Sequence, residues 1–289
     1  MLLATFLLAA VFLLAWGGIH VMLPLLWRVF FRLGRGLARL AFGPQRLARW
    51  SEHGILGLRP PRHPYRRVVL IGLCGFLAAA VVGAGFLALG EEVRESSASL
   101  QRMDHHVWEL ARSHRSPGRT LFFTAFTLLG TPVGLGAVVA LATGALYTRG
   151  FRRLPLFVIV STLGAWGIDT LLKLLFARAR PDLTLAVRTS SGYSFPSGHA
   201  MMSLVTFGAL VYALLRASDR RAVQSVGAAA ALTAVLAISV SRVYLGVHWI
   251  SDIAGGWAAG LLWLATSIAA YEVLRRLRLI RAGTALPTA

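Results

Sequence analysis

The sequence predicts an all-α polytopic membrane protein. Of its 289 residues, 56% are hydrophobic and only 14% are charged, and the mean hydropathy is +0.67. A soluble domain usually carries about 25% charged residues. The apolar residues also gather in long runs separated by short polar or basic segments. Because a helix needs roughly 20 apolar residues to cross a bilayer, these runs predict membrane-spanning helices.

We predict spanning helices at residues 2–27, 68–90, 120–147, 154–176, 199–215, 222–240 and 253–273. The first run has no basic segment before it and no small-residue cleavage site, so we expect a true span and not a removed signal peptide. Gly130 and Pro132 loosen the third run, and Pro181 helps to stop the helix of the fourth. Polar residues between the second and third runs predict a loop with a short helix over 103–113.

The segment 28–67 is strongly basic, and Glu52 is its one acid. Arg28, Arg32, Arg35 and Arg39 recur at helical spacing with apolar residues between them, which predicts an amphipathic helix lying in the headgroup layer. We expect this segment to contact anionic phospholipid headgroups. The positive-inside rule favours a topology anchor over a lipid-sensing or partner-binding role.

The formal net charge of +19 would suggest a nucleic-acid partner in a soluble protein. Here most of the 30 lysines and arginines fall in 28–67, 149–153, 216–221 and the tail, which predicts a cytoplasmic face and no nucleic-acid partner. The amino terminus then lies outside and the tail inside. We divide the chain into an N-terminal helix (1–27), the basic segment (28–67), a core (68–274) and a basic tail (275–289).

Few residues suggest a metal site. The polar loop carries His105, His106 and His114 with Asp104 and Glu109, but their spacing fits no compact ligand motif. The chain's one cysteine, Cys74, lies in an apolar run, which excludes a disulfide framework and a cysteine-based metal site.

Three polar islands interrupt the apolar second half of the chain. They are Lys173 with Arg180-Pro181, then Pro196-Ser197-Gly198-His199, then Ser241-Arg242 with His248 and Asp252. The chain crosses the membrane an even number of times between islands, so all three should reach one face. The charge distribution makes that face external, hence periplasmic in a bacterium.

Local spacing suggests how the islands could bind an anion. Ser197 is placed to cap a helix, and Gly198 lets backbone approach a ligand at its positive end. Lys173 and Arg180 are seven residues apart, which would put them on one helical face. Asp169, four residues before Lys173, could instead pair with it and explain both residues structurally.

The two histidines add reactive groups. His248 and Asp252 are four apart, so they share a face if the segment is helical, and otherwise Asp252 can still set the imidazole tautomer. One histidine can attack phosphorus while a second protonates the departing oxygen and later activates water. Lysine and arginine would stabilise the phosphoryl oxygens. Since no carboxylate cluster suited to Mg²⁺ accompanies them, we expect metal-independent catalysis without a cofactor.

The islands resemble the signature of the type 2 phosphatidic acid phosphatase (PAP2) superfamily. Its pattern is Lys-x6-Arg-Pro, Pro-Ser-Gly-His and Ser-Arg-x5-His-x3-Asp, and this chain matches every specified position. The tract 244–249 also looks like the bacterial membrane members. The resemblance implies a six-helix core over 68–273, to which the first predicted span adds one extra N-terminal transmembrane helix.

The resemblance also implies roles. His248 would be the nucleophile, Asp252 would orient it, and His199 would act as general acid and then base. The phosphate-binding residues would be Lys173, Arg180, Ser197, Gly198 and Arg242. We therefore expect a lipid phosphatase of the bacterial inner membrane with its active site facing the periplasm. Undecaprenyl diphosphate is the first substrate candidate, and phosphatidic acid, phosphatidylglycerol phosphate and lipid A are alternatives.

Two other classes of protein compete with this interpretation. Vanadate-dependent haloperoxidases share this signature, but they are soluble, and the apolar runs argue against that class. A lipid transporter or flippase would place charges near the middle of the membrane in repeated halves. Here the charges gather at the ends of the predicted spans, which favours the phosphatase.

Overall fold

The structure is a computed structural model that describes residues 64–187 and 190–284, and the regular elements in those ranges are all helices. In chain order they are α3 (Pro64–Arg94), α4 (Ala98–Ser113), α5 (Pro117–Leu129), α6 (Pro132–Thr148), α7 (Arg153–Phe176), the 3₁₀ helix η1 (Leu183–Leu185), α8 (Gly198–Ala217), α9 (Arg221–Tyr244) and α10 (Ile250–Thr284). The all-α prediction is confirmed. The predicted first span, and the basic segment apart from its last four residues, lie outside the described ranges.

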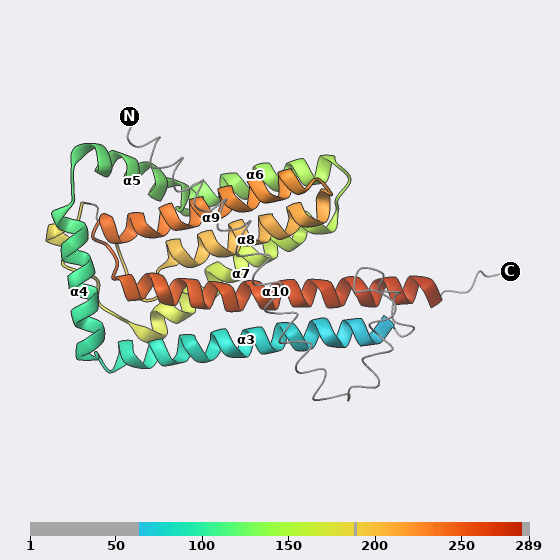
Figure 1. Cartoon of the computed structure of the whole chain (residues 1–289), viewed down its shortest axis with the longest axis horizontal. Coiled ribbons are helices and arrows are strands. Elements are labelled where there is room, and N and C mark those ends of the chain that lie inside the picture. Colours follow the sequence, from blue (N-terminus) through green and yellow to red (C-terminus); the bar gives the residue numbers. More distant parts are fainter. Residues whose placement is uncertain (1–63, 188–189, 285–289) are drawn as a thin grey trace, which may run out of the picture.

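The long helices run side by side, and α4 lies across one end of them (Figure 1). The helices α3 and α10 pack along each other, while α8 contacts α7, α9 and α10. The basic turns between α6 and α7 and between α8 and α9 lie at the end opposite α4 (Figure 1). The connections at the two ends of the bundle therefore differ: short basic turns lie at one end, and long polar segments lie at the other.

Among the described residues, four helices are long and apolar enough to span a membrane: α7, α8, α9 and α10 up to Arg275. The pair α5 and α6 makes a fifth if it is taken as one bent span. The predicted run 68–90 forms most of α3, which packs against α10. The chain is thus a multi-pass membrane protein, as predicted.

The third predicted span is not one continuous helix. The chain bends by 57° between α5 and α6, at Gly130 and Thr131. Pro132 has no N–H to continue a helix and takes the first position of α6. The Thr131 Oγ1 caps that helix by accepting a hydrogen bond from the Gly134 N–H at 3.1 Å. These residues divide the span, whereas the sequence predicts only a loosened helix.

Two helix ends also differ from the prediction. The helix α9 continues to Tyr244, so Ser241 and Arg242 lie in its last turn and not in a polar interruption. The reversal is confined to 245–249, where Gly246 adopts a φ of +82°. The helix α10 then runs beyond the predicted end at 273 to Thr284, because no proline or turn residue stops it.

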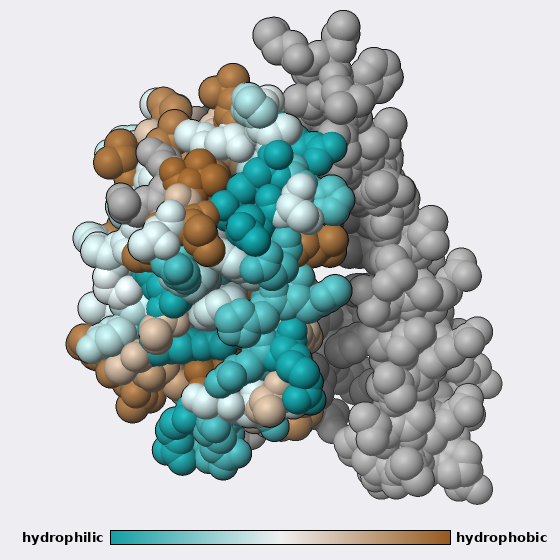
Figure 2. Space-filling view, turned by 90° about the vertical axis from the view of Figure 1, so that its left-hand side faces the viewer, coloured by the Kyte–Doolittle hydropathy of each residue, from teal (hydrophilic) through white to brown (hydrophobic). Residues whose placement is uncertain are grey.

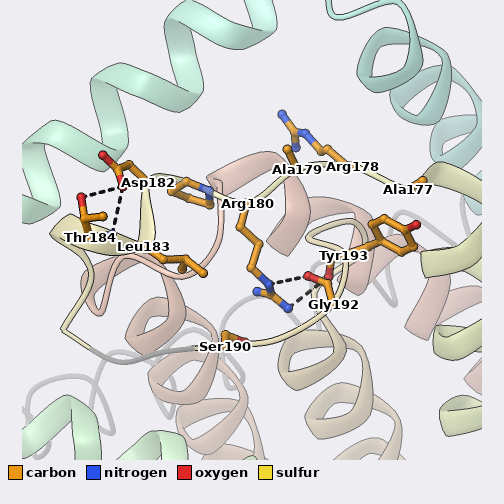
Figure 3. A pocket seen from close by; sticks show the side chains of 11 residues that line it. Ala177, Arg178, Ala179, Arg180, Asp182, Leu183, Thr184, Ser190, Gly192 and Tyr193 are labelled. Carbon is orange, nitrogen blue, oxygen red and sulfur yellow. Dashed lines mark hydrogen bonds between the residues drawn. The ribbon is translucent and has the colours of Figure 1, made fainter.

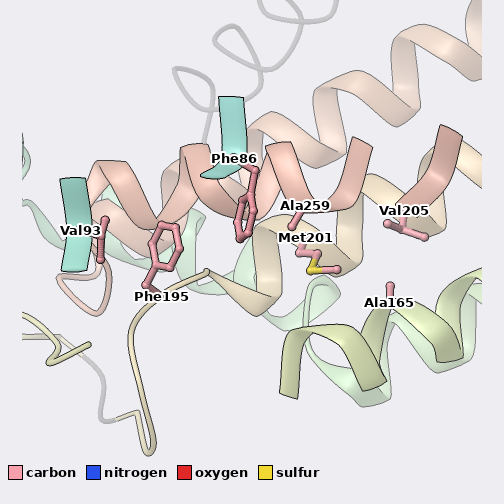
Figure 4. Close-up of a cluster of buried hydrophobic side chains, with 7 residues drawn as sticks. All are labelled: Phe86, Val93, Ala165, Phe195, Met201, Val205 and Ala259. Atoms are coloured by element: carbon pink, nitrogen blue, oxygen red, sulfur yellow. The ribbon is translucent and has the colours of Figure 1, made fainter. Parts of the chain in front are cut away.

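A buried apolar cluster anchors the loop that leads into α8. Phe195 is completely buried and stacks on Phe86 of α3, with ring centroids 5.9 Å apart. Figure 4 shows both rings with the other members of this cluster, which are Val93, Ala165, Met201, Val205 and Ala259. Gly255 of α10 faces the Phe195 ring so closely that a side chain there would collide with it. The core therefore fixes the residues on either side of Phe195.

Helix packing predicts different effects for two glycines of α7. A Cβ at Gly164 would overlap the Trp263 ring, whose Nε1 donates to the Ser161 carbonyl at 2.7 Å, whereas a Cβ at Gly167 would meet nothing within 4 Å. We expect Gly164→Ala to destabilise the protein by about 1–3 kcal/mol through overpacking. The matched Gly167→Ala should be neutral or stabilising by roughly 0.5–1 kcal/mol. Thermal unfolding in detergent checks this prediction. Equal melting temperatures for Gly164→Ala and Gly167→Ala would contradict the close contact between Gly164 and Trp263.

Candidate active site

The three islands meet at the end of the bundle that α4 covers. The Ser194 N–H donates to the Arg178 carbonyl and the Ser197 N–H donates to the Asp252 carbonyl, both at 2.9 Å. The first bond joins the segment after α7 to the loop before α8, and the second joins that loop to α10. Figure 2 looks onto this end and shows hydrophilic residues gathered across it.

His248 and Asp252 form a buried pair, with side chains 3% and 0% exposed. His248 lies in the turn before α10, so the two residues do not share a helical face. The other possibility given in the sequence analysis remains, that Asp252 sets the tautomer of the imidazole. The Asp252 Oδ2 lies 3.2 Å from the His248 Nδ1. It also accepts hydrogen bonds from the Trp249 N–H at 2.9 Å and from the Ser194 hydroxyl. A carboxylate oxygen accepts, so Nδ1 carries the hydrogen and Nε2 keeps its lone pair.

The surroundings of His248 favour the neutral imidazole. Burial is the main cause that lowers the pKa of His248; Asp252 opposes this shift and Arg242 and Arg180 add to it, and the net result is a pKa of about 4. The ordinary value is 6.5. At neutral pH the ring is therefore uncharged and able to act as a nucleophile.

Arg180 reaches His248 from outside the helices. The helix α7 ends at Phe176, and Ala177 takes a left-handed φ of +43°, so our prediction of one helical face for Lys173 and Arg180 is wrong. The Arg180 Nη1 lies 3.1 Å from the His248 Nε2 and also donates to the Val247 carbonyl at 2.8 Å. Its other nitrogens donate to the carbonyls of residues 191–193, and Figure 3 shows the contact with Gly192.

Lys173 pairs with Asp169, the structural alternative weighed above. Its Nζ lies 2.6 Å from Asp169 Oδ2. The pair also abuts the start of α8, because a Cβ at Gly198 would lie 2.7 Å from Nζ and 2.8 Å from Oδ2. The absence of a side chain at Gly198 thus lets the ammonium group reach the positive end of α8.

The first residues of α8 carry polar atoms that have no partner within the part of the protein described. Ser197 occupies the N-cap position, as predicted, but its hydroxyl makes no capping bond. The Ser197 Oγ and the His199 Nε2 are both buried, and neither has a hydrogen-bond partner among the described residues. Buried polar atoms of a native protein are usually hydrogen-bonded, so these two indicate a position for a polar ligand.

Arg242 and His199 line a cavity of about 620 Å³ together with Thr127, Leu128, Thr131, Ser190 and Ser191. The Arg242 Nη1 donates to the Thr127 Oγ1 at 2.7 Å. A Cβ at Gly130 would lie 2.9 Å from the His199 ring, so the break between α5 and α6 closes against that histidine. The bent span therefore forms one wall of the site.

Comparison with known proteins agrees with this geometry. Residues 154–276 match the PAP2 superfamily. The phosphatidylglycerophosphatase B of Bacillus subtilis (strain 168) is 31% identical over 187 residues, which are 61% of this chain and 86% of that protein. This chain belongs to the PAP2 superfamily. It is a membrane lipid phosphatase and therefore a phosphoric ester hydrolase.

Two further comparisons concern other PAP2-type proteins. An undecaprenyl-diphosphatase of Sulfolobus acidocaldarius is 32% identical over 114 residues, which cover 38% of this chain and 51% of that protein. The crystal structure of a transmembrane PAP2-type phosphatidylglycerolphosphate phosphatase from Bacillus subtilis superposes with a TM-score of 0.63 at 24% identity. It covers 68% of this chain and 96% of that one, and it shows a common fold.

Four residues that the structure brings to this cluster have no role in it in the sequence analysis: Asp104, Thr127, Arg178 and Ser194. Ser194 stands two residues before Pro196, where the second island begins, and Arg178 stands between Lys173 and Arg180, so position alone could have suggested these two. Asp104 and Thr127 have no such signal, because their partners lie more than 70 residues away. The other residues of the polar loop form no metal-ligand group in the part of the chain described, and His105 packs on Trp249 at 4.8 Å.

The space beside Gly198 predicts a loss of phosphate binding on substitution. Gly198→Ala would push the Lys173 and Asp169 side chains away from α8, while alanine itself favours the helix. We expect inhibition by orthovanadate, a phosphate analogue, to weaken roughly tenfold, which is the effect of losing one charged hydrogen bond. Gly136→Ala on α6, where a Cβ meets nothing within 4 Å, is the control. Unchanged inhibition of folded Gly198→Ala protein would contradict this arrangement.

Proposed function

We propose that this enzyme hydrolyses a lipid phosphate or diphosphate through a phosphohistidine formed on His248. The observation that carries this proposal is the buried His248–Asp252 pair. The His248 Nδ1 lies 3.2 Å from the Asp252 Oδ2, and the His248 Nε2 faces the Arg180 guanidinium. A neutral imidazole fixed in this tautomer is a nucleophile aimed into a positively charged space.

In the first step, the lone pair of His248 Nε2 attacks phosphorus and forms a P–N bond. The bond from phosphorus to the lipid oxygen breaks, and protonated His199 gives that oxygen a proton. The His248 ring becomes positively charged, and the Asp252 carboxylate beside Nδ1 stabilises that charge. The products of this step are the lipid alcohol, or the lipid monophosphate from a diphosphate, and the phosphorylated enzyme.

In the second step, neutral His199 takes a proton from water. The water oxygen attacks phosphorus, the P–N bond breaks, and its electron pair returns to Nε2. Inorganic phosphate leaves, His248 is neutral again and His199 is protonated for the next turnover. The overall reaction consumes one water and needs no oxidant or reductant.

Phosphate oxygens would be bound by Lys173, Arg180 and Arg242 together with Ser197 and Gly198 at the start of α8. The buried Ser197 hydroxyl and the positive helix end support this assignment. Arg180 now donates to His248 Nε2, so an incoming phosphoryl group would have to take over that N–H before attack. Substrate binding and exposure of the nucleophile would then be one event. These side chains would supply the positive charge, and we therefore expect catalysis without a metal ion.

The site should face the periplasm of a bacterial inner membrane. The basic turns at 149–153 and 216–221 lie at the opposite end of the bundle (Figure 1), which the positive-inside rule assigns to the cytoplasm. A headgroup could then reach His248 at the water boundary while its chains remain in the bilayer. The headgroup contacts proposed for 28–67 would lie on the cytoplasmic side.

Undecaprenyl diphosphate and phosphatidylglycerol phosphate are the two leading substrate candidates. The archaeal relative is named for the first activity and the bacterial relative for the second. Phosphatidic acid and lipid A remain in the test panel, because the same phosphate site would accept their monoesters.

The first experiment measures phosphate release from the four lipids by detergent-purified protein in EDTA. We expect release to persist, and His248→Ala to lower kcat by roughly 10⁴-fold or more, as loss of a nucleophile does elsewhere. Folding is checked by melting temperature. Full turnover by His248→Ala would refute the nucleophile, and loss of wild-type activity in EDTA would refute the metal-independent route.

The pKa of His248 predicts the acid limit of phosphorylation. Because the pKa is lowered to about 4, mainly by burial, the imidazole stays neutral as the pH falls through 6.5 and gains a proton only near pH 4. We would use His199→Ala with p-nitrophenyl phosphate, whose leaving group needs no general acid, and measure bound phosphate after alkaline quenching. An acid limb centred near pH 6.5 would contradict the lowered pKa.

A further inference from the structure

Arg178 lies between two buried carboxylates. Its Nη1 donates to Asp252 Oδ1 at 2.6 Å, and its Nη2 donates to Asp104 Oδ2 at 2.7 Å. Asp252 belongs to α10 and Asp104 to α4, and their side chains are 0% and 2% exposed. In Figure 3, the side chains of Arg178 and Arg180 point away from each other, so the two arginines have different neighbours.

The two oxygens of Asp252 have separate partners. Oδ2 accepts from His248, Trp249 and Ser194, whereas among the described residues only Arg178 donates to Oδ1. The last torsion of an aspartate is broad, so a carboxylate held at one oxygen can turn. Arg178 removes this freedom and keeps Oδ2 directed at His248 Nδ1.

Asp104 controls the charge of this group as well as its geometry. Arg178 alone with Asp252 would form a neutral pair, which would weaken the support that Asp252 gives to a positively charged His248. With Asp104 added, the group contains two carboxylates and one guanidinium, and its net charge is about −1. Asp104 thus lets Arg178 hold the carboxylate without cancelling its charge.

The same acid fixes α4 to the start of α10. Asp104 Oδ1 accepts from the Ser251 N–H at 3.0 Å, and Oδ2 accepts from the Ser251 Oγ at 2.6 Å. Ser251 also accepts from Arg178 Nη1 at 2.7 Å. These bonds surround the residue next to Asp252, and a carboxylate at this helix end is favourable to the helix dipole.

We propose that Asp104 and Arg178 are positioning residues for phosphoryl transfer. Together they hold the Asp252 carboxylate in the plane and charge state that orient His248. On this view α4 is part of the catalytic apparatus, although it carries none of the motif residues. The inference rests on the proposed function, since it assigns both residues to the His248 step.

The test compares Asp104→Asn and Arg178→Gln with wild-type full-length protein. We expect kcat to fall roughly tenfold to a hundredfold, the effect of misplacing a reacting group. The KM and the inhibition constant of inorganic phosphate should change little, because neither residue is assigned to the phosphate. A lower melting temperature with unchanged kcat per folded enzyme would show a structural role alone and overturn the proposal.

A double-mutant cycle tests whether Asp104 acts through Asp252. If it does, adding Asp104→Asn to Asp252→Asn should lower kcat little further, because the oriented carboxylate is already lost. Losses that multiply would overturn this route. The matched control is Glu272→Gln, which breaks another partly buried ion pair, 2.6 Å from Arg275 on α10, outside the site. Its kcat should equal that of wild type.

Wild type and His248→Ala separate this inference from the proposed function. If turnover requires His248 and Asp104→Asn keeps the wild-type kcat, the positioning role fails and the proposed function stands. If turnover does not require His248, both fail.

Discussion

The site depends on the burial of one carboxylate, that of Asp252. A buried carboxylate is strongly unfavourable unless it is paired and hydrogen-bonded. Its partners come from separate places: His248 and Trp249 from the turn before α10, Ser194 from the loop before α8, and Arg178 from the segment after α7. Satisfying this one group therefore fixes three segments that the sequence keeps far apart.

The apolar surfaces of the helices explain why this polar cluster lies at an end of the bundle. On α7, Leu171, Leu174 and Leu175 are 67%, 65% and 75% exposed, as expected for a lipid-facing surface, while the neighbouring Lys173 turns inward to Asp169. Charged groups are costly within the hydrocarbon region and less so at its boundary with water. A phosphatase for lipids needs that boundary, because its substrate is charged at one end and apolar at the other.

Much of this could be predicted from the sequence, and the failures have physical reasons. Apolar runs and motif spacing located the helices around 154–273 and the meeting of the islands, since both depend on local composition and on counting crossings. The break at Gly130 and Thr131 is larger than predicted, because Thr131 caps a new helix there and the chain bends by 57°. The predicted helical position of Arg180 is wrong because α7 ends four residues earlier, at Phe176. Ala177 then takes a left-handed backbone conformation, which alanine does not indicate in a sequence. The ion pair between Asp104 and Arg178 could not be predicted, because residues so far apart in the chain form no periodic pattern in the sequence.

Two cations of the cluster are compensated by carboxylates within the protein. Lys173 is paired with Asp169, and Arg178 is paired with Asp104 and Asp252. This compensation limits repulsion among cations in a buried space, which would otherwise destabilise the fold. Of the two cations, Lys173 is the proposed phosphate ligand, so a bound phosphate would compete with Asp169 for its ammonium group. This competition would limit the affinity of the proposed site for inorganic phosphate, the product, and so would favour its release.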